Sequence, residues 1–307
     1  GHTSSSRSAR PGGRRWIRLP GCNNVHEMSL PAVRGHQELR QRLAHAVAAG
    51  TVSQSILLQG PRGAGKERTG LWLGQLLVCE APLAAGPCRQ CQPCRLAERL
   101  EHPDLHWFFP LPRPDGATPE KLREKLEDAR ATELALRRDN PGHVPRYEKA
   151  PAIYLAAVQR IQQLASVKPA MGRRKVFVVG DAELMVPQES SQEAANAFLK
   201  LLEEPPDDTT IVITSSQPGA LLPTILSRVL SIRVAQPGDE AVRDYLPVEL
   251  EMPEDGAVRL VQLSRGWVGL AMRLAGEEGE GGRARTAARA LLIAALSTGG
   301  VARLAAA

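Results

Sequence analysis

The sequence of 307 residues has no run of about 18 consecutive apolar residues, which excludes a membrane-spanning helix of ordinary length. Its first residues carry charge but lack the apolar stretch that a secretory signal peptide requires. It also has only five cysteines and is long enough to bury a sizeable core, so a disulfide scaffold is not needed for folding. Together these absences predict a cytoplasmic protein.

Excess positive charge is scarce outside the first 27 residues, although the formal net charge of the chain is +6. Residues 1–27 contain five arginines and a single glutamate, and they are rich in Ser and Gly. This composition is typical of a disordered basic tail. The folded part is expected to begin at Met28, and its small surplus of charge does not by itself predict direct contact with DNA.

Short apolar runs indicate buried strands, and amphipathic helical patterns occur between and around them. The apolar runs cover 55–59, 175–179 and 210–214, and the helical patterns cover 35–49, 153–167 and 193–203. Strands that alternate with helices predict an α/β fold, with a parallel sheet covered by helices on both faces.

The remaining segments predict how the chain is divided. Residues 28–234 are expected to form the α/β domain, with a surface insertion at 111–149 that contains a charged, solvated helix near 118–138. A small helical lid domain is expected at 235–276. Residues 277–307 are expected to hold the rest of a glycine-rich linker and an Ala/Leu-rich helix.

A glycine-rich loop with the sequence GPRGAGK follows the first strand at 60–66 and opens a helix. In the arrangement G-x-x-x-x-G-K, backbone N–H groups surround phosphate oxygens and the lysine reaches the β- and γ-phosphates. The next residue should be Ser or Thr, which binds Mg²⁺, but here it is a glutamate. A glycine-rich turn that no longer binds nucleotide is therefore an equal alternative. The candidate residues are Gly60, Gly63, Gly65, Lys66 and Glu67.

The second strand departs from the ATPase pattern as well. A working ATPase of this type ends that strand with two acidic residues, of which one holds Mg²⁺ and the other orients water. Here Gly180 stands at the position of the Mg²⁺ ligand, and Asp181 follows it. Asp181 could polarise a water molecule or only cap the next helix. Because both metal contacts are altered, we expect no efficient catalysis by this chain on its own.

Four of the five cysteines have the spacing C-x8-C-x2-C-x2-C, whereas Cys22 lies apart in the tail. Four thiolates suit tetrahedral Zn²⁺, and the two-residue gaps suit its ligand turns. Such closed coordination is structural, because it leaves no open position for catalysis. Redox-active thiols or unpaired core cysteines are the alternatives. The predicted zinc module, 79–94, has the ligands Cys79, Cys88, Cys91 and Cys94.

Three further segments complete a resemblance to the gamma/tau/delta-prime group of the bacterial DNA polymerase III clamp-loader family, which belongs to the AAA+ class. These are HPD at 102–104, AANAFLKLLEEPP at 194–206 and LPTILSR at 222–228. The resemblance covers roughly 28–276 and is strongest over 175–230. Intact phosphate loops and paired acids mark the motor subunits of that group, so the altered residues here are similar to its non-motor branch.

The resemblance implies roles for residues that composition and spacing do not assign. Arg228 is expected to reach the ATP site of a neighbouring motor subunit as an arginine finger, whose guanidinium stabilises charge on the γ-phosphoryl oxygens. A contact with helix-end carbonyls or with a local acid is the alternative. Ser215 falls at the first sensor position, and Gly269 replaces the second sensor arginine. Val229 stands where the family usually has cysteine.

The function that the resemblance implies is that of a non-motor clamp-loader subunit in DNA replication, part of the DNA-directed DNA polymerase holoenzyme. The implied partners are the gamma/tau and delta subunits, with the sliding clamp and primed DNA reached through the complex. Residues 277–307 would begin a helical collar that is truncated here. The alternatives are an ATP-hydrolysing gamma/tau-type motor subunit and a zinc-containing binding module.

Overall fold

The computed structural model describes most of the chain between residues 33 and 293. The described residues are 33, 35–118, 120–139, 143, 145, 147–185, 193–250, 254–275 and 286–293. The predicted basic tail and glycine-rich linker lie outside them, as does the last helical segment except for 286–293, which is helical. Within the described ranges, no helix is both long and apolar enough to cross a membrane.

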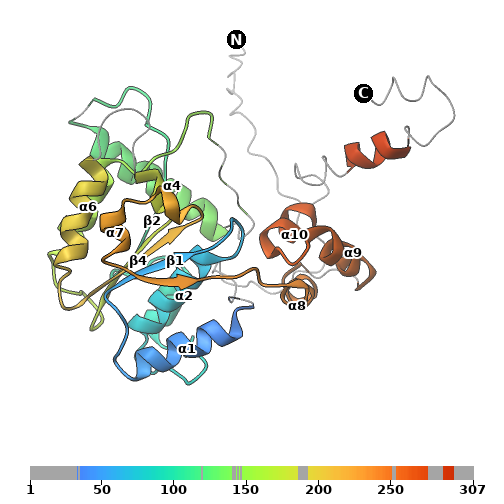
Figure 1. Ribbon diagram of the computed structural model, residues 1–307, viewed down its shortest axis with the longest axis horizontal. Helices are drawn as coiled ribbons and strands as arrows, with labels where there is room; N and C mark the ends of the chain where they lie inside the picture. Colours follow the sequence, from blue (N-terminus) through green and yellow to red (C-terminus); the bar gives the residue numbers. More distant parts are fainter. Residues whose placement is uncertain are drawn as a thin grey trace, which may run out of the picture.

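A sheet of five strands forms the centre of the larger part of the molecule (Figure 1). The strand order is β2-β3-β4-β1-β5, and every neighbouring pair is parallel. The strands are β1 (Ser55–Gln59), β2 (Leu105–Phe108), β3 (Lys175–Val179), β4 (Thr209–Ser215) and β5 (Leu230–Arg233). The prediction of an α/β fold with a parallel sheet is confirmed.

Helices cover both faces of the sheet. Because successive side chains of a strand point to opposite faces, Ile56 and Leu58 join one core with α1 and α2, whereas Leu57 joins the other core with α5 and α6. The helices of this part are α1 (Gln37–Ala48), α2 (Lys66–Val78), α3 (Gln92–Glu98), α4 (Leu122–Asp139), α5 (Leu155–Ala165), α6 (Glu193–Glu203) and α7 (Pro223–Leu226).

The carboxyl ends of the central strands lie together along one end of the sheet. Gln59 at the end of β1 is paired with Ser215 at the end of β4, and Val179 at the end of β3 is paired with Ile213. In open parallel sheets ligands bind at this carboxyl-terminal end of the strands. The loops that leave β1, β3 and β4 therefore converge there, and they carry the candidate nucleotide residues.

The helix of the insertion, α4, packs against the α/β part with one of its faces. Leu126 joins the core beside α2, and Glu133 is also buried, although most other α4 side chains are at least partly exposed. The expected solvated surface helix thus has one face that contacts the domain. This contact brings residues from the insertion to the carboxyl-terminal end of the strands, where the nucleotide loop lies.

Three further helices follow β5 and lie beside the α/β part in Figure 1. They are α8 (Asp239–Leu250), α9 (Glu254–Ser264) and α10 (Val268–Ala275), and they pack on one another. The turn between α9 and α10 reaches back to the phosphate loop, where Trp267 packs against the core of the α/β part. The helices fall in the segment expected to form a lid.

Candidate nucleotide site and metal centre

The glycine-rich loop between β1 and α2 requires glycine at several positions. A Cβ on Gly60 would lie 2.1 Å from the carbonyl oxygen of Val234, which leaves no room for a side chain. Gly63 and Gly65 have φ angles of 82° and 83°, in the left-handed region that favours glycine. The loop therefore has the backbone form of a phosphate-binding turn at the start of α2.

The ammonium group of Lys66 is bound within the loop. Its Nζ donates to the carbonyl oxygen of Pro61 at 3.0 Å and to the Oγ of Ser216 at 2.9 Å. Burial lowers the pKa of Lys66, and the carboxylates of Asp181 and Glu183 partly oppose that effect. Sequence analysis points to Ser215 in this region, but the hydroxyl that contacts Lys66 belongs to the next residue.

Glu67 is held by donors from two distant parts of the chain. Its Oε2 accepts a hydrogen bond from the Trp107 indole nitrogen at 2.9 Å and lies 3.5 Å from a terminal nitrogen of Arg137. Burial raises the pKa of Glu67, whereas the positive charge of Arg137 lowers it. The carboxylate that replaces the usual Mg²⁺-binding hydroxyl is thus already engaged by protein groups.

Arg137 comes from the insertion helix α4 and is itself held on several sides. Its Nε donates to Glu133 at 2.8 Å, and its guanidinium lies 4.5 Å from the ring centre of Trp107 and 3.9 Å from that of Phe109. These are cation–π distances. Sequence reasoning missed Arg137 and Trp107, because nothing in their local pattern relates them to a loop 70 and 40 residues away.

Gly180 lies beneath the carboxylate of Glu67. A Cβ at position 180 would stand 2.7 Å from Glu67 Oε2, closer than such atoms approach in proteins. The space that an acidic side chain at the end of β3 would need is therefore filled by Glu67. The two departures that sequence analysis finds separately, at positions 67 and 180, form one packed unit.

Asp181 and Ser215 take part in the turns that leave their strands. Asp181 has a φ angle of 43°, and its N–H donates to Thr214 Oγ1 at 3.1 Å. Burial and the nearby Glu183 carboxylate raise the pKa of Asp181, with Lys66 opposing them. Ser215 is fully buried, and its Oγ accepts from the N–H of Gln217 at 3.1 Å. These contacts give both residues a structural role, while their roles toward nucleotide stay predictions.

Two side chains from other parts of the chain lie against the phosphate loop. The Nε2–H of His36 donates to the carbonyl oxygen of Ala64 at 2.7 Å, and burial lowers the pKa of His36. Trp267, just before α10, approaches so closely that a Cβ on Gly63 would lie 3.1 Å from its ring. Trp267, two residues before Gly269, thus lies against the phosphate loop from the side of α10, although residues 61–63 are exposed.

The segment HPD has a structural explanation. The carboxylate of Asp104 is fully buried and accepts hydrogen bonds from the backbone N–H groups of Ala170, Met171 and Gly172, at 2.7, 2.7 and 3.1 Å. Burial alone would raise the pKa of Asp104, but these donors outweigh it and the pKa lies below its ordinary value. His102 accepts the Asp104 N–H at its Nδ1.

Arg228 lies just after α7, and its side chain is 35% exposed. One terminal nitrogen is 2.8 Å from Glu203 Oε1, and the other donates to the Thr224 carbonyl at 2.9 Å and to Ser227 Oγ at 3.2 Å. The next residue, Val229, packs against the core that includes α5 and α6. Both interpretations of Arg228, as a finger or as a partner of a local acid, are compatible with this position.

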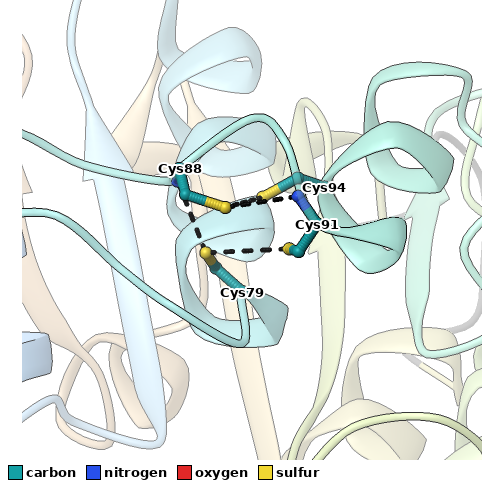
Figure 2. A group of neighbouring side chains, drawn as sticks. All are labelled: Cys79, Cys88, Cys91 and Cys94. Carbon is teal, nitrogen blue, oxygen red and sulfur yellow. Dashed lines mark hydrogen bonds between the residues drawn. The ribbon is translucent and has the colours of Figure 1, made fainter.

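The four clustered cysteines come together at the carboxyl end of α2 and the start of α3 (Figure 2). All four sulfur atoms lie within 4.8 Å of one another; Cys88 and Cys94 are 3.9 Å apart, and Cys79 and Cys91 are 4.0 Å apart. Four sulfur ligands around a tetrahedral ion with bonds of about 2.3 Å would be separated by roughly 3.8 Å. The cluster can therefore hold a metal ion with little movement.

Backbone N–H groups support this arrangement of thiols. The N–H of Cys88 donates to Cys79 Sγ, and the N–H of Cys91 donates to Cys88 Sγ, each at 3.4 Å. Cys94 is fully buried within α3, whereas the other three are half-buried. Such donors stabilise thiolates, which is the form that binds a metal.

A parallel sheet with a phosphate loop after β1 and three helices beside that loop defines a P-loop fold of the AAA+ class, here with an altered nucleotide site. The chain belongs to the family described as "DNA polymerase III, delta subunit", whose profile matches residues 35–238. The predicted relationship to the DNA polymerase III subunits is thus confirmed.

Curated relatives carry names from the same enzyme. The chain is 33% identical to the DNA polymerase III subunit delta' of Pseudomonas aeruginosa over 227 residues, which are 73% of this chain and 56% of the relative. It is 28% identical to the delta' subunit of Bacillus subtilis, over 66% of this chain and 49% of the relative. It is 28% identical to the tau subunit of Escherichia coli, over 69% of this chain and 26% of the relative. The chain spans about half the length of the delta' relatives.

Proposed function

We propose that the protein is a non-motor, delta-prime-like subunit of a DNA polymerase III clamp loader and supports loading of the sliding clamp in DNA replication. The observation that carries this proposal is the contact of Glu67 with Trp107 and Arg137, at the position where a motor subunit needs Mg²⁺. Binding of a cation there would have to displace a charge-assisted contact that already satisfies the carboxylate. Membership of the family supports the same conclusion.

In this proposal the chain contributes to catalysis only through a neighbour. The partial exposure of Arg228 supports a contact with another subunit, and an arginine finger is worth about 10³–10⁵ in rate in related phosphoryl-transfer systems. The proposed partners are gamma/tau subunits, which would receive Arg228, and the delta subunit. The clamp and primed DNA would be contacted through the complex. Residues 28–234 would form the AAA+ domain and 235–276 the lid.

The metal of the four-cysteine cluster is proposed to be Zn²⁺. Four thiols at this spacing and these separations favour a soft, tetrahedral ion. Bound Zn²⁺ would join the end of α2 to the start of α3 and hold the loop between them. Its role would be structural, because four protein ligands leave no open position for a substrate.

The first test is binding and hydrolysis of Mg·ATP by the purified chain, with Lys66→Ala as the control. We expect no turnover above that of the control. Turnover that depends on Lys66 would overturn the proposal and identify an ATP-hydrolysing subunit of the gamma/tau type.

A second test addresses Arg228 in a reconstituted loader. Replacement by alanine is expected to reduce ATP turnover by the neighbouring motor subunit, while the complex still assembles. Unchanged turnover and clamp loading would contradict the role of Arg228 and favour a zinc-containing binding module.

A further inference from the structure

The guanidinium of Arg228 is not left to rotate freely at the surface. It contacts three acceptors that come from two elements: Glu203 at the end of α6, and Thr224 and Ser227 in and just after α7. An arginine has five N–H donors in a planar fork. Within the described part of the chain, three of these five N–H groups contact an acceptor. Two N–H groups therefore remain for an acceptor on another molecule.

The three contacts differ in what they can fix. Thr224 and Ser227 belong to the same short segment as Arg228, so their contacts fix the guanidinium relative to that segment, which the fully buried Ile225 anchors. Glu203 belongs to a different element, α6, which is anchored by the fully buried Phe198 and by the buried Leu202. The ion pair of 2.8 Å therefore joins the guanidinium to a second element, α6, in addition to the segment that carries Arg228.

We infer that Glu203 is a positioning residue for Arg228: it holds the guanidinium in the orientation in which its remaining N–H groups face a neighbouring subunit. This inference rests on the proposed function, since it assigns Glu203 a task only if Arg228 acts in trans. Arginine has many rotamers, and a finger that is already oriented loses less freedom when it meets the phosphoryl group. The negative charge of Glu203 reduces the field of Arg228 only modestly, because both side chains are partly exposed and screened.

The experiment measures ATP turnover by the neighbouring motor subunit in the reconstituted loader containing this chain. Glu203→Ala is expected to lower kcat about 10-fold with the KM for ATP unchanged, because an oriented group contributes in the transition state. Glu203→Gln keeps an oxygen acceptor and is expected to lower kcat only about 3-fold. The matched control is Glu204→Gln, which removes a charge from the adjacent position, also exposed.

Two further measurements separate the possible results. Thermal unfolding and assembly of each variant are expected to match the unmodified chain, and Glu203→Ala is expected to add nothing to Arg228→Ala. If Arg228→Ala reduces turnover but Glu203→Ala equals or exceeds the unmodified chain, the inference is overturned and the proposed function stands. If Arg228→Ala is also silent, both the finger and its positioning residue are overturned.

Discussion

The carboxylate of Glu67 fills the space above Gly180, where a Cβ would stand 2.7 Å from its Oε2. In a working ATPase these two positions hold a hydroxyl and an acid that share one Mg²⁺. Here the larger side chain on α2 and the missing side chain at the end of β3 complement each other. Restoring either position alone would leave a clash or a gap, so the two changes depend on each other.

Gly180→Asp is expected to destabilise the protein by about 2 kcal/mol, because it forces a second carboxylate against the half-buried one of Glu67. Adding Glu67→Thr should recover most of the loss. Unfolding in urea measures both variants. Gly219→Asp, at a position with open space around it, is the control and should change little. Equal destabilisation with and without Glu67→Thr would contradict the coupling.

Arg137→Ala is expected to cost about 2 kcal/mol at pH 8, because it leaves the carboxylate of Glu67 without its positive partner. The pKa of Glu67 is already raised by burial and would rise further without Arg137. At a pH above the unfolded pKa, a carboxyl group whose pKa is raised by folding destabilises the folded state. The loss of stability in Arg137→Ala should therefore shrink as the pH falls toward the ordinary carboxyl range. Urea unfolding at pH 8 and pH 5 measures this difference.

The control for that variant is Arg138→Ala, which removes the adjacent arginine and its exposed ion pairs with Glu101 and Asp139. Surface pairs of this kind contribute about 0–1 kcal/mol. A similar loss for both variants, or a loss for Arg137→Ala that does not depend on pH, would argue against a specific contact with Glu67.

Asp104→Asn is expected to destabilise the fold by about 2–3 kcal/mol, because three backbone N–H groups lose a charged acceptor. The pKa of Asp104 is depressed in the folded state. Its stabilisation is therefore complete above the unfolded pKa and is lost as the pH falls through the lower, folded pKa. The free energies of unfolding of the variant and the unmodified chain, measured between pH 7 and pH 2, should converge at the acid end. Asp207→Asn, on the exposed surface, is the control.

Removal of metal should loosen the segment between α2 and α3. We expect about one Zn²⁺ per purified chain by elemental analysis, and a lower melting temperature after chelation that added Zn²⁺ restores. Cys94→Ser should lose the metal, because this ligand is fully buried among the others. Cys22→Ser, remote from the cluster in sequence, should retain it. A chain that contains no stoichiometric metal and is indifferent to chelation would contradict the site.

Sequence analysis locates the central strands closely. The predicted runs 55–59 and 175–179 coincide with β1 and β3, and 210–214 lies within β4, because continuous apolar runs are typical of strands buried on both faces. It does not predict β2 and β5. Both have only four residues, and β5 lies at the edge of the sheet with mostly exposed side chains, so neither has a continuous apolar pattern.

The sequence alone determined the features that depend on residues close together in the chain. These are the glycines of the phosphate loop, whose backbone form needs them within seven positions, and the cysteine cluster, whose ligands lie within sixteen. The surroundings of the loop, in contrast, follow from the way the whole chain folds. Glu67 meets Trp107 and Arg137 because the sheet places β2 near α2 and the insertion helix packs beside them. Such contacts depend on strand order and helix packing, which no local pattern encodes.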